Sequence, residues 1–310
     1  MKATSAPDYR LPALQLALSG LLWLLWALLP ADSYRDWVLL GPVLLLVGIP
    51  HGANDLLLLR KRFPQLPPRR AFGLYLAVFL ASAGLMLWLP LPGLVLFLVI
   101  TAYHFGQGDL HDHLRPRAAR RADGLYVAWG ANLLAALLAL RAHELPGYLP
   151  DGYGFAAITD FFVALPNTPL AYGAVAAGLL AGAAAGGWLS WPEAGLRLAA
   201  TVFLLLLFTH TRLLVGFAVY FGIWHSVDSI RLFSRSLYPP DGAAGFRQFY
   251  RDALPITVLA FLFLGGLLWL SAQIELPYPL TFVLFIFIFA ITVPHVFVTE
   301  PIYRRSRGVE

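Results

Sequence analysis

Cysteine is absent from this sequence. Without thiols, the chain cannot form disulfides, thiolate zinc sites, iron–sulfur clusters or a thiolate-ligated haem. Any metal that this protein binds must therefore be coordinated by nitrogen and oxygen atoms.

Charged residues are also scarce. Only 13% of the 310 residues are charged, 59% are hydrophobic, and the mean hydropathy is +0.70. Soluble globular domains carry about 25% charged residues, so this composition indicates an integral membrane protein. We predict an all-α fold, a polytopic helical bundle that forms a single transmembrane domain over residues 1–310.

Ten apolar runs have about the length needed to cross a hydrocarbon core of roughly 30 Å. They cover residues 11–30, 37–59, 71–90, 92–108, 122–142, 168–188, 196–213, 215–232, 254–273 and 277–299. The first run has no clear cleavage site and is expected to be a retained helix rather than a signal peptide. The stretch 150–167 is a candidate for an additional interfacial segment.

The net charge of +5 is explained by topology rather than by nucleic-acid binding, because the basic residues lie between the apolar runs. With ten spans, every Lys and Arg except Arg35, Arg141 and Arg212 falls on the side of the amino terminus. The positive-inside rule then places both termini in the cytoplasm. We expect a multi-pass protein of the cell inner membrane, with the lipid bilayer and no nucleic acid as its partner.

Four histidines lie at similar depth in these predicted spans, and each is followed within five residues by an acid. The pairs are His51 with Asp55, His104 with Asp109, His225 with Asp228, and His295 with Glu300. Ionisable groups within a bilayer are costly, so they usually face the bundle interior and mark function. A shared polar site is therefore predicted.

Imidazole is a good ligand for iron, zinc, copper or nickel, and a carboxylate often orients a ligating histidine. Residues three or four positions apart share a helix face, so Asp55 is expected beside His51 and Asp228 beside His225. Asp109 and Glu300 lie five positions on, and we expect broken backbone near them, at "GQGD" and "TEP".

Small residues and prolines are expected to give this site room. Gly48 and Gly52 form a GxxxG face that lets helices approach closely. Pro50 and Pro294 directly precede two of the histidines and are expected to open their helices.

The remaining histidines are assigned no role in the site. His111 and His113 are expected on the surface of a basic loop, and His143 and His210 near the opposite membrane face. Aromatic residues around the site, which include Tyr103, Phe105, Phe221 and Trp224, suggest a long apolar substrate such as a polyene, sterol or quinone.

The blocks "GIPHGANDL", "YHFGQGD", "WHSVDSIR" and "PHVFVTE" resemble, in this order, the Brp/Blh family of bacterial and archaeal membrane β-carotene 15,15′-dioxygenases. The resemblance extends from about residue 48 to residue 300 and is strongest near the histidines. It implies a non-haem Fe(II) enzyme that uses O₂ to cleave the central double bond of β-carotene into two retinals, often to supply a rhodopsin as acceptor.

For such chemistry, the metal ligands would be His51, His104, His225 and His295. Asp55, Asp109 and Asp228 would orient the imidazoles, and Tyr103 is a candidate hydrogen-bond donor to a reacting oxygen.

One position departs from the family pattern. The third block of the family usually carries a second histidine one turn after the first, and Ser229 stands there in this chain. Because serine is a poor iron ligand, His295, Asp228 or water would have to complete the coordination. A divergent homologue acting on another carotenoid or apolar lipid therefore remains an alternative.

Other classes of membrane protein also remain open. Intramembrane His and Asp residues serve metal-ion and proton transporters, although no convincing internal repeat is present. Paired histidines can anchor haem in a membrane subunit. Di-iron desaturases need closely spaced histidine pairs, which only "HDH" approaches.

Overall fold

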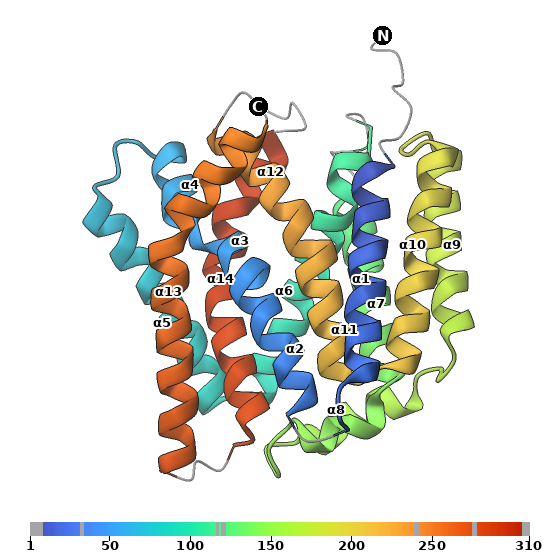
Figure 1. Cartoon of the computed structure of the whole chain (residues 1–310), viewed down its shortest axis with the longest axis horizontal. Coiled ribbons are helices and arrows are strands. Elements are labelled where there is room, and N and C mark those ends of the chain that lie inside the picture. The colour runs from blue at the N-terminus through green and yellow to red at the C-terminus, as the bar shows by residue number, and fades with distance from the viewer. Residues whose placement is uncertain are drawn as a thin grey trace.

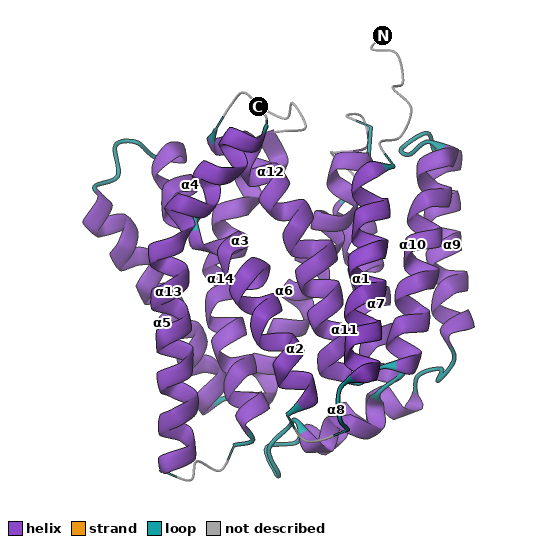
Figure 2. Cartoon of the chain, in the orientation of Figure 1, coloured by secondary structure: helices purple, strands orange, loops and turns teal. Residues whose placement is uncertain are grey.

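The computed structural model describes residues 9–31, 34–115, 118, 122–238, 242–274 and 278–305. Over these residues the chain consists of helices and loops (Figure 2). The α-helices are α1 (Arg10–Leu28), α2 (Arg35–Val43), α3 (Ile49–Ala53), α4 (Asp55–Arg62), α5 (Pro68–Trp88), α6 (Pro90–Leu110), α7 (Asp123–Ala139), α8 (Phe155–Ala164), α9 (Pro169–Ala185), α10 (Trp191–His210), α11 (Leu213–Val219), α12 (Val227–Leu237), α13 (Ala243–Gln273) and α14 (Leu280–Arg305). The shorter turns are η1 (Leu44–Gly48), η2 (His111–His113), η4 (Ala142–Gly147) and η5 (Tyr220–Ser226).

The all-α membrane fold predicted from composition is confirmed. Within the described residues, eight helical segments are long and apolar enough to cross a membrane. The predicted spans 122–142 and 168–188 correspond to α7 and α9, which have only 17 residues each. α8 and α9 form a pair bent by 80°. The number of ten spans therefore stays a prediction.

Capping residues and prolines begin several of these helices. Thr168 caps α9 by accepting a hydrogen bond from the Leu170 amide, and Pro169 follows at the first helical position. Ser190 caps α10 in the same way, through the Glu193 amide. Both pairs combine a hydroxyl N-cap with a proline in the first turn, which satisfies or removes donors that a helix start leaves unpaired.

Two of the spans contain wider π-helical turns. Arg35–Arg62 joins α2, η1, α3 and α4, and Leu213–Leu237 joins α11, η5 and α12. The π turn η1 ends two residues before Pro50, and η5 contains His225. Such turns occur frequently at functional sites.

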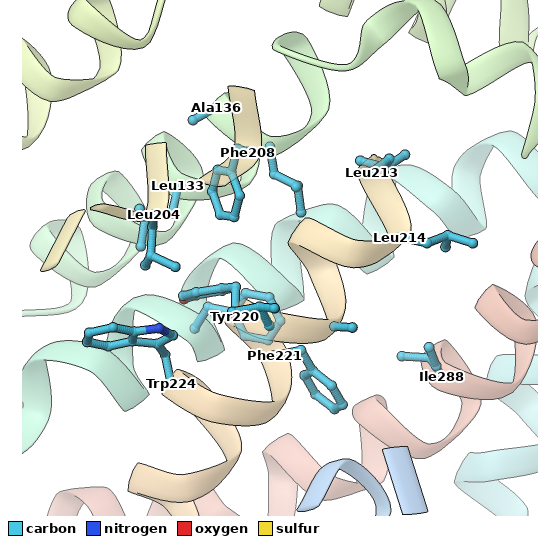
Figure 3. Packing of buried hydrophobic residues seen from close by; sticks show 14 of the residues in the cluster. Leu133, Ala136, Leu204, Phe208, Leu213, Leu214, Tyr220, Phe221, Trp224 and Ile288 are labelled. Carbon is cyan, nitrogen blue, oxygen red and sulfur yellow. The ribbon is translucent and has the colours of Figure 1, made fainter. Parts of the chain in front are cut away.

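The core is continuous across the bundle. Figure 3 shows Leu133 and Ala136 of α7 and Leu204 and Phe208 of α10 near the side chains of α11 and η5. α6 and α7 approach closely at two glycines, where a Cβ on Gly106 would lie 1.9 Å from the Tyr126 carbonyl oxygen and one on Gly130 would lie 1.8 Å from the Ala102 carbonyl oxygen. A larger residue at either position is therefore incompatible with the packing.

The two ends of the described chain lie at the same end of the bundle. In Figure 1 the start of α1 and the end of α14 are both at the top, and α8 lies across the bottom. This arrangement is that of an even number of crossings. The side of the membrane that each end faces stays a prediction.

Candidate metal centre

Four histidines from four helical segments meet inside the bundle. His51 comes from α3, His104 from α6, His225 from η5 and His295 from α14, and each is between 0 and 6% exposed. The ring centroids of His51 and His295 are 4.8 Å apart, and those of His104 and His225 are 4.7 Å apart. The His104 and His295 rings are 5.0 Å apart.

Three of these residues have nitrogen atoms that could bind one ion. Ring nitrogens of His51, His104 and His295 lie within 4.8 Å of one another, close enough for the three rings to converge on one ion. His225 flanks this trio, with its ring 5.4 Å from that of His51. The described residues therefore contain a three-histidine group with a fourth histidine in contact.

Five ring nitrogens in this cluster lack a protein partner among the described residues. Both nitrogens of His104, both of His225 and Nε2 of His295 are buried without a hydrogen-bond partner among the described residues. Each such buried group costs about 1–3 kcal/mol if nothing satisfies it. A metal ion would satisfy one nitrogen of each ring. The all-nitrogen donor set suits iron, zinc, copper or nickel.

Glycines make the space that the rings occupy. A Cβ on Gly108 would lie 2.9 Å from Nδ1 of His225, and a Cβ on Gly52 would lie 3.4 Å from Nδ1 of His295. On the other glycine of the predicted GxxxG face, a Cβ on Gly48 would lie 2.8 Å from Cε1 of Phe221. Small residues at these positions admit side chains from neighbouring helices.

The carboxylate next to the histidines is not paired as expected. Asp55 lies against His295, with Nδ1 of His295 2.9 Å from Oδ1 of Asp55, and not against His51. The reason is a local break, since α3 ends at Ala53 and the chain turns at Asn54 before α4 begins. Nδ1 of His51 instead contacts the Gly48 carbonyl oxygen. Tyr75 of α5 donates a hydrogen bond of 3.0 Å to Oδ2 of Asp55.

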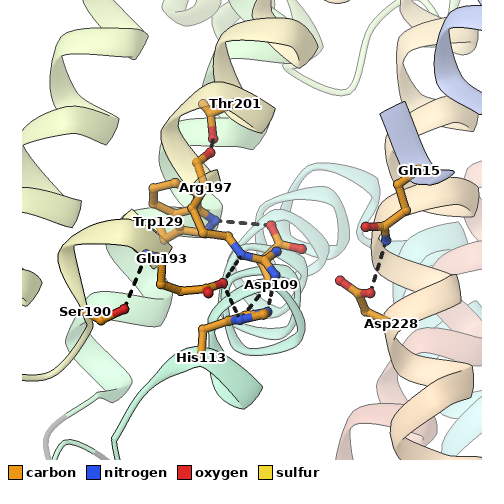
Figure 4. A network of polar contacts seen from close by, with 9 residues as sticks. All are labelled: Gln15, Asp109, His113, Trp129, Ser190, Glu193, Arg197, Thr201 and Asp228. Carbon is orange, nitrogen blue, oxygen red and sulfur yellow. Dashed lines mark hydrogen bonds and ion pairs between the residues drawn. The ribbon is translucent and has the colours of Figure 1, made fainter. Parts of the chain in front are cut away.

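Asp109 and Asp228 also lie apart from the histidine nitrogens, contrary to the prediction. Asp109 accepts hydrogen bonds from Trp129 and Tyr220, at 3.2 and 2.8 Å, and Asp228 accepts one from Gln15 at 3.1 Å. Figure 4 shows Asp109 with Trp129 beside the Arg197, Glu193 and His113 group, and Asp228 as a separate pair with Gln15. Asp109 is displaced because α6 continues as a regular helix, in which five positions do not return to the same face. The π turn at His225 widens the helix and breaks the expected relation to Asp228.

Glu300 and Tyr103 pair with each other. The Tyr103 hydroxyl donates to Glu300 at 3.0 Å, and Gln107 donates to the same carboxylate at 2.7 Å. The broken backbone expected near Glu300 is wrong, because this residue lies inside α14. Asp109 lies in the last turn of α6, which ends at Leu110 and continues as η2. Tyr103 is not among the described residues that line the cavity beside the histidines, so its expected contact with a reacting oxygen has no support in the geometry.

An apolar cavity of about 310 Å³ adjoins the histidines. Its polar lining is confined to the histidines, Asp55, Tyr75, Thr101 and Thr292. The remaining lining is aliphatic and aromatic and includes Phe72, Phe79, Phe97, Phe105, Phe217, Phe221, Phe263 and Phe287. A largely apolar pocket with a few convergent polar groups is the usual form of a small-molecule site.

The other histidines differ in their surroundings. The prediction that His111 lies on the surface is wrong. His111 is buried, and its ring lies 4.9 Å from that of Tyr303 of α14. His113 is only partly exposed and pairs with Glu193 at 2.6 Å. His143 and His210 lie away from the cluster, and the His143 side chain is 71% exposed.

Tyr75 and Thr101 were missed by the sequence reasoning. Both line the cavity, and the Thr101 hydroxyl is buried without a hydrogen-bond partner among the described residues. In the sequence, these residues stand out only as hydroxyl groups within apolar runs. Ser82 has the same property, so this feature alone does not identify Tyr75 as a residue of the site.

Comparison with known proteins bears on the same region of the chain. A family model described as beta-carotene 15,15′-dioxygenase matches residues 43–303, which include all four clustered histidines. The chain is 30% identical over 246 residues to a protein of Halobacterium salinarum described as "Probable beta-carotene 15,15′-dioxygenase Blh", over 72% of this chain and 70% of that protein. No solved structure matches the chain significantly.

Proposed function

Because the chain belongs to the β-carotene 15,15′-dioxygenase family, we propose that it cleaves the central double bond of β-carotene with O₂. One molecule of the C40 polyene and one of O₂ would give two molecules of retinal, one oxygen atom entering each aldehyde. The observation that carries this proposal is the buried histidine cluster at the end of an apolar cavity. Family membership favours this enzyme over the transporter and haem-anchoring alternatives.

The resident metal is proposed to be non-haem Fe(II), held by His51, His104 and His295 with His225 as a fourth ligand. The unpartnered ring nitrogens and the absence of thiols from the sequence support this donor set. When bound, such an ion supplies the activation of O₂.

Protein groups would orient two of these imidazoles. Asp55 accepts from Nδ1 of His295, which leaves Nε2 of that ring as the donor to a metal. The Gly48 carbonyl oxygen contacts Nδ1 of His51 and selects the same tautomer. Tyr75 in turn holds Asp55 through its hydroxyl. The role proposed for Asp55 is therefore positioning of His295.

The cavity would bind the polyene and exclude water. Its aromatic and aliphatic walls offer the apolar surface that a carotenoid requires, and two of its polar groups, Asp55 and Tyr75, are linked by hydrogen bonds to His295. Holding the central double bond there would replace a diffusional encounter with a fixed orientation. Excluding water would protect the reactive oxygen from side reactions.

The setting of this reaction is proposed to be the cell inner membrane. The eight long apolar helices support a multi-pass location in a lipid bilayer, from which an apolar carotenoid can be drawn. Retinal released there would be available to a rhodopsin in the same membrane.

Expression in cells that accumulate β-carotene, followed by chromatography of the lipid extract, tests the proposal. We expect retinal to form at the expense of β-carotene, and purified protein to contain about one iron per chain. Intact β-carotene with iron bound would favour the alternative of a divergent homologue with another apolar substrate, which Ser229 motivates. Protein without iron and without product would contradict both.

A further inference from the structure

Two outer helices face the cavity with regularly spaced side chains. On α5, Phe72, Tyr75, Leu76 and Phe79 line it, and on α13, Ile256, Leu259, Ala260 and Phe263 line it. Both sets follow the spacing of one helix face. α5 and α13 therefore form one wall of the cavity, and Tyr75 connects this wall to the histidines through its hydrogen bond to Asp55.

This wall is only one side chain thick. Among the described residues that line the cavity, the exposed ones all belong to these two helices: Phe72 at 49%, Leu76 at 38%, Leu259 at 60% and Phe263 at 50%. The lining residues Phe105, Phe221 and His225, which come from α6 and η5, are buried. Since α5 and α13 are both long and apolar enough to span a membrane, their exposed side chains face lipid.

The two helices are held by other parts of the bundle rather than by each other. α5 packs on α14 and α6, and α13 packs on α3 and α14. Between α5 and α13, the Phe79 and Phe263 rings meet edge to face with centroids 6.1 Å apart. Phe263 also contacts Phe287 of α14 at 6.2 Å. Aromatic rings in such contacts can change rotamer without disturbing the helix axes.

We infer that the gap between α5 and α13 is a lateral portal through which the polyene passes from the bilayer to the histidines. That the molecule passing through is β-carotene rests on the proposed function. Phe79 and Phe263 close one part of the portal, and Leu76, Leu259 and Ala260 line the rest. An elongated apolar molecule can enter this way without crossing water, and part of it can remain between the two helices while its centre lies at the histidines.

Bulky substitutions at the portal test this inference. Leu76→Trp and Ala260→Trp add volume to the opening, whereas Leu80→Trp and Leu262→Trp add it at exposed positions of the same helices that do not line the cavity. We expect kcat/KM for β-carotene to fall about tenfold or more in the portal variants, with iron content unchanged, since access and fit both suffer. The control variants should retain the parental value. Equal activity in all four variants would overturn the inference.

A reversible crosslink across the portal distinguishes blocked substrate access from misfolding. The natural chain has no cysteine, so Phe79→Cys/Phe263→Cys introduces the only two thiols. A cleavable bifunctional methanethiosulfonate should then abolish activity when it links them, and reductant should restore it in the same sample. Full activity in the linked protein would overturn the portal.

A binding measurement distinguishes failure of the portal from failure of the proposed reaction. β-Carotene retained by purified protein is measured by its visible absorption in the parent and in the Trp variants. If the parent binds β-carotene without making retinal, the proposed reaction fails, and weaker retention in the portal variants alone would still support the portal. If all variants bind and cleave as the parent does, the reaction stands and the portal is wrong.

Discussion

At the scale of single residues, the centre is assembled by contacts between helices that are distant in sequence. His295 of α14 finds its carboxylate in Asp55, which lies four positions after a different histidine. Tyr75 of α5 extends this chain of hydrogen bonds. Such partners fix the tautomer and orientation of a ligating histidine, and their loss usually weakens metal binding about 10- to 100-fold. The chain from Tyr75 to His295 is thus a positioning device for one imidazole.

Replacing His51, His104 or His295 singly with Ala should remove bound iron and abolish retinal formation, because the three ring nitrogens converge on one place. Iron per chain in the purified variants is the direct measurement. His143→Ala is the matched control, since that side chain is exposed and remote. His111 is unsuitable as a control because it is buried against Tyr303. Full iron content in all three variants would contradict the shared site.

Asp55→Asn should lower iron affinity by about 10- to 100-fold, the usual effect of removing a carboxylate partner from a ligating histidine. Tyr75→Phe should act in the same direction but less, because Asp55 keeps its contact with His295. Titration of the metal-free proteins with Fe(II) gives the affinities. If the two effects simply add in the double variant, the residues act independently, and the proposed chain of contacts is wrong.

Much of this centre could be predicted from sequence at the level of residue type and depth. The four histidines, their membrane level and the resemblance to the carotenoid-cleaving family follow from local motifs, and the family assignment is confirmed. The pairing of Asp55 with His295 could not be predicted, because it depends on the turn at Asn54 and on how α14 packs beside α3 and α4. Asp109 shows the same limit, since its partners Trp129 and Tyr220 come from two other segments.

At the scale of helices, π turns and glycines determine how the rings fit. Proline was expected to open the helix at both His51 and His295. A π turn does precede Pro50, whereas α14 remains one helix through Pro294. A helix can accommodate the missing amide hydrogen of a proline with a π turn or as a continuous α-helix. The proline alone therefore does not predict which backbone forms.

Gly108→Ala should disturb the centre through His225. The added methyl group would lie 2.9 Å from Nδ1 and 3.2 Å from Cε1 of that ring, so the imidazole must move. Overpacking of this kind costs about 1–3 kcal/mol, and we expect lower activity together with weaker iron binding. Gly124→Ala is the matched control, because nothing lies within 4 Å of its Cβ position. Unchanged iron affinity and turnover in Gly108→Ala would show that His225 is not constrained there.

At the scale of the whole molecule, composition predicted the class of fold well, since burying so many apolar residues in one chain of this length requires a membrane. Composition does not determine which helices cross the membrane. α7 and α9 are short for a hydrocarbon core, and α8 with α9 makes a sharp bend. Short helices can be accommodated by local thinning of the bilayer or by snorkelling of flanking side chains, so length alone does not decide whether they cross.

The histidine cluster also joins parts of the bundle that are far apart in the chain. α3, α6, η5 and α14 each contribute one ring, so a bound ion would link the first third of the sequence to its last helix. An ion that binds the folded protein stabilises it by mass action, by about 2.7 kcal/mol at 100 times its dissociation constant. Removing the metal with a chelator should therefore lower the midpoint of thermal unfolding in detergent.

Fe(II), but not Mg²⁺, should restore this midpoint, because Mg²⁺ prefers oxygen ligands and the cluster offers nitrogen. The Trp residues of the chain provide an intrinsic fluorescence signal for the measurement. A variant that lacks His104 serves as control, since its melting should no longer respond to chelator or to Fe(II). Identical melting of the metal-loaded and chelated parent would mean that no ion links these four segments, and the histidines would then have to be satisfied by something other than a metal.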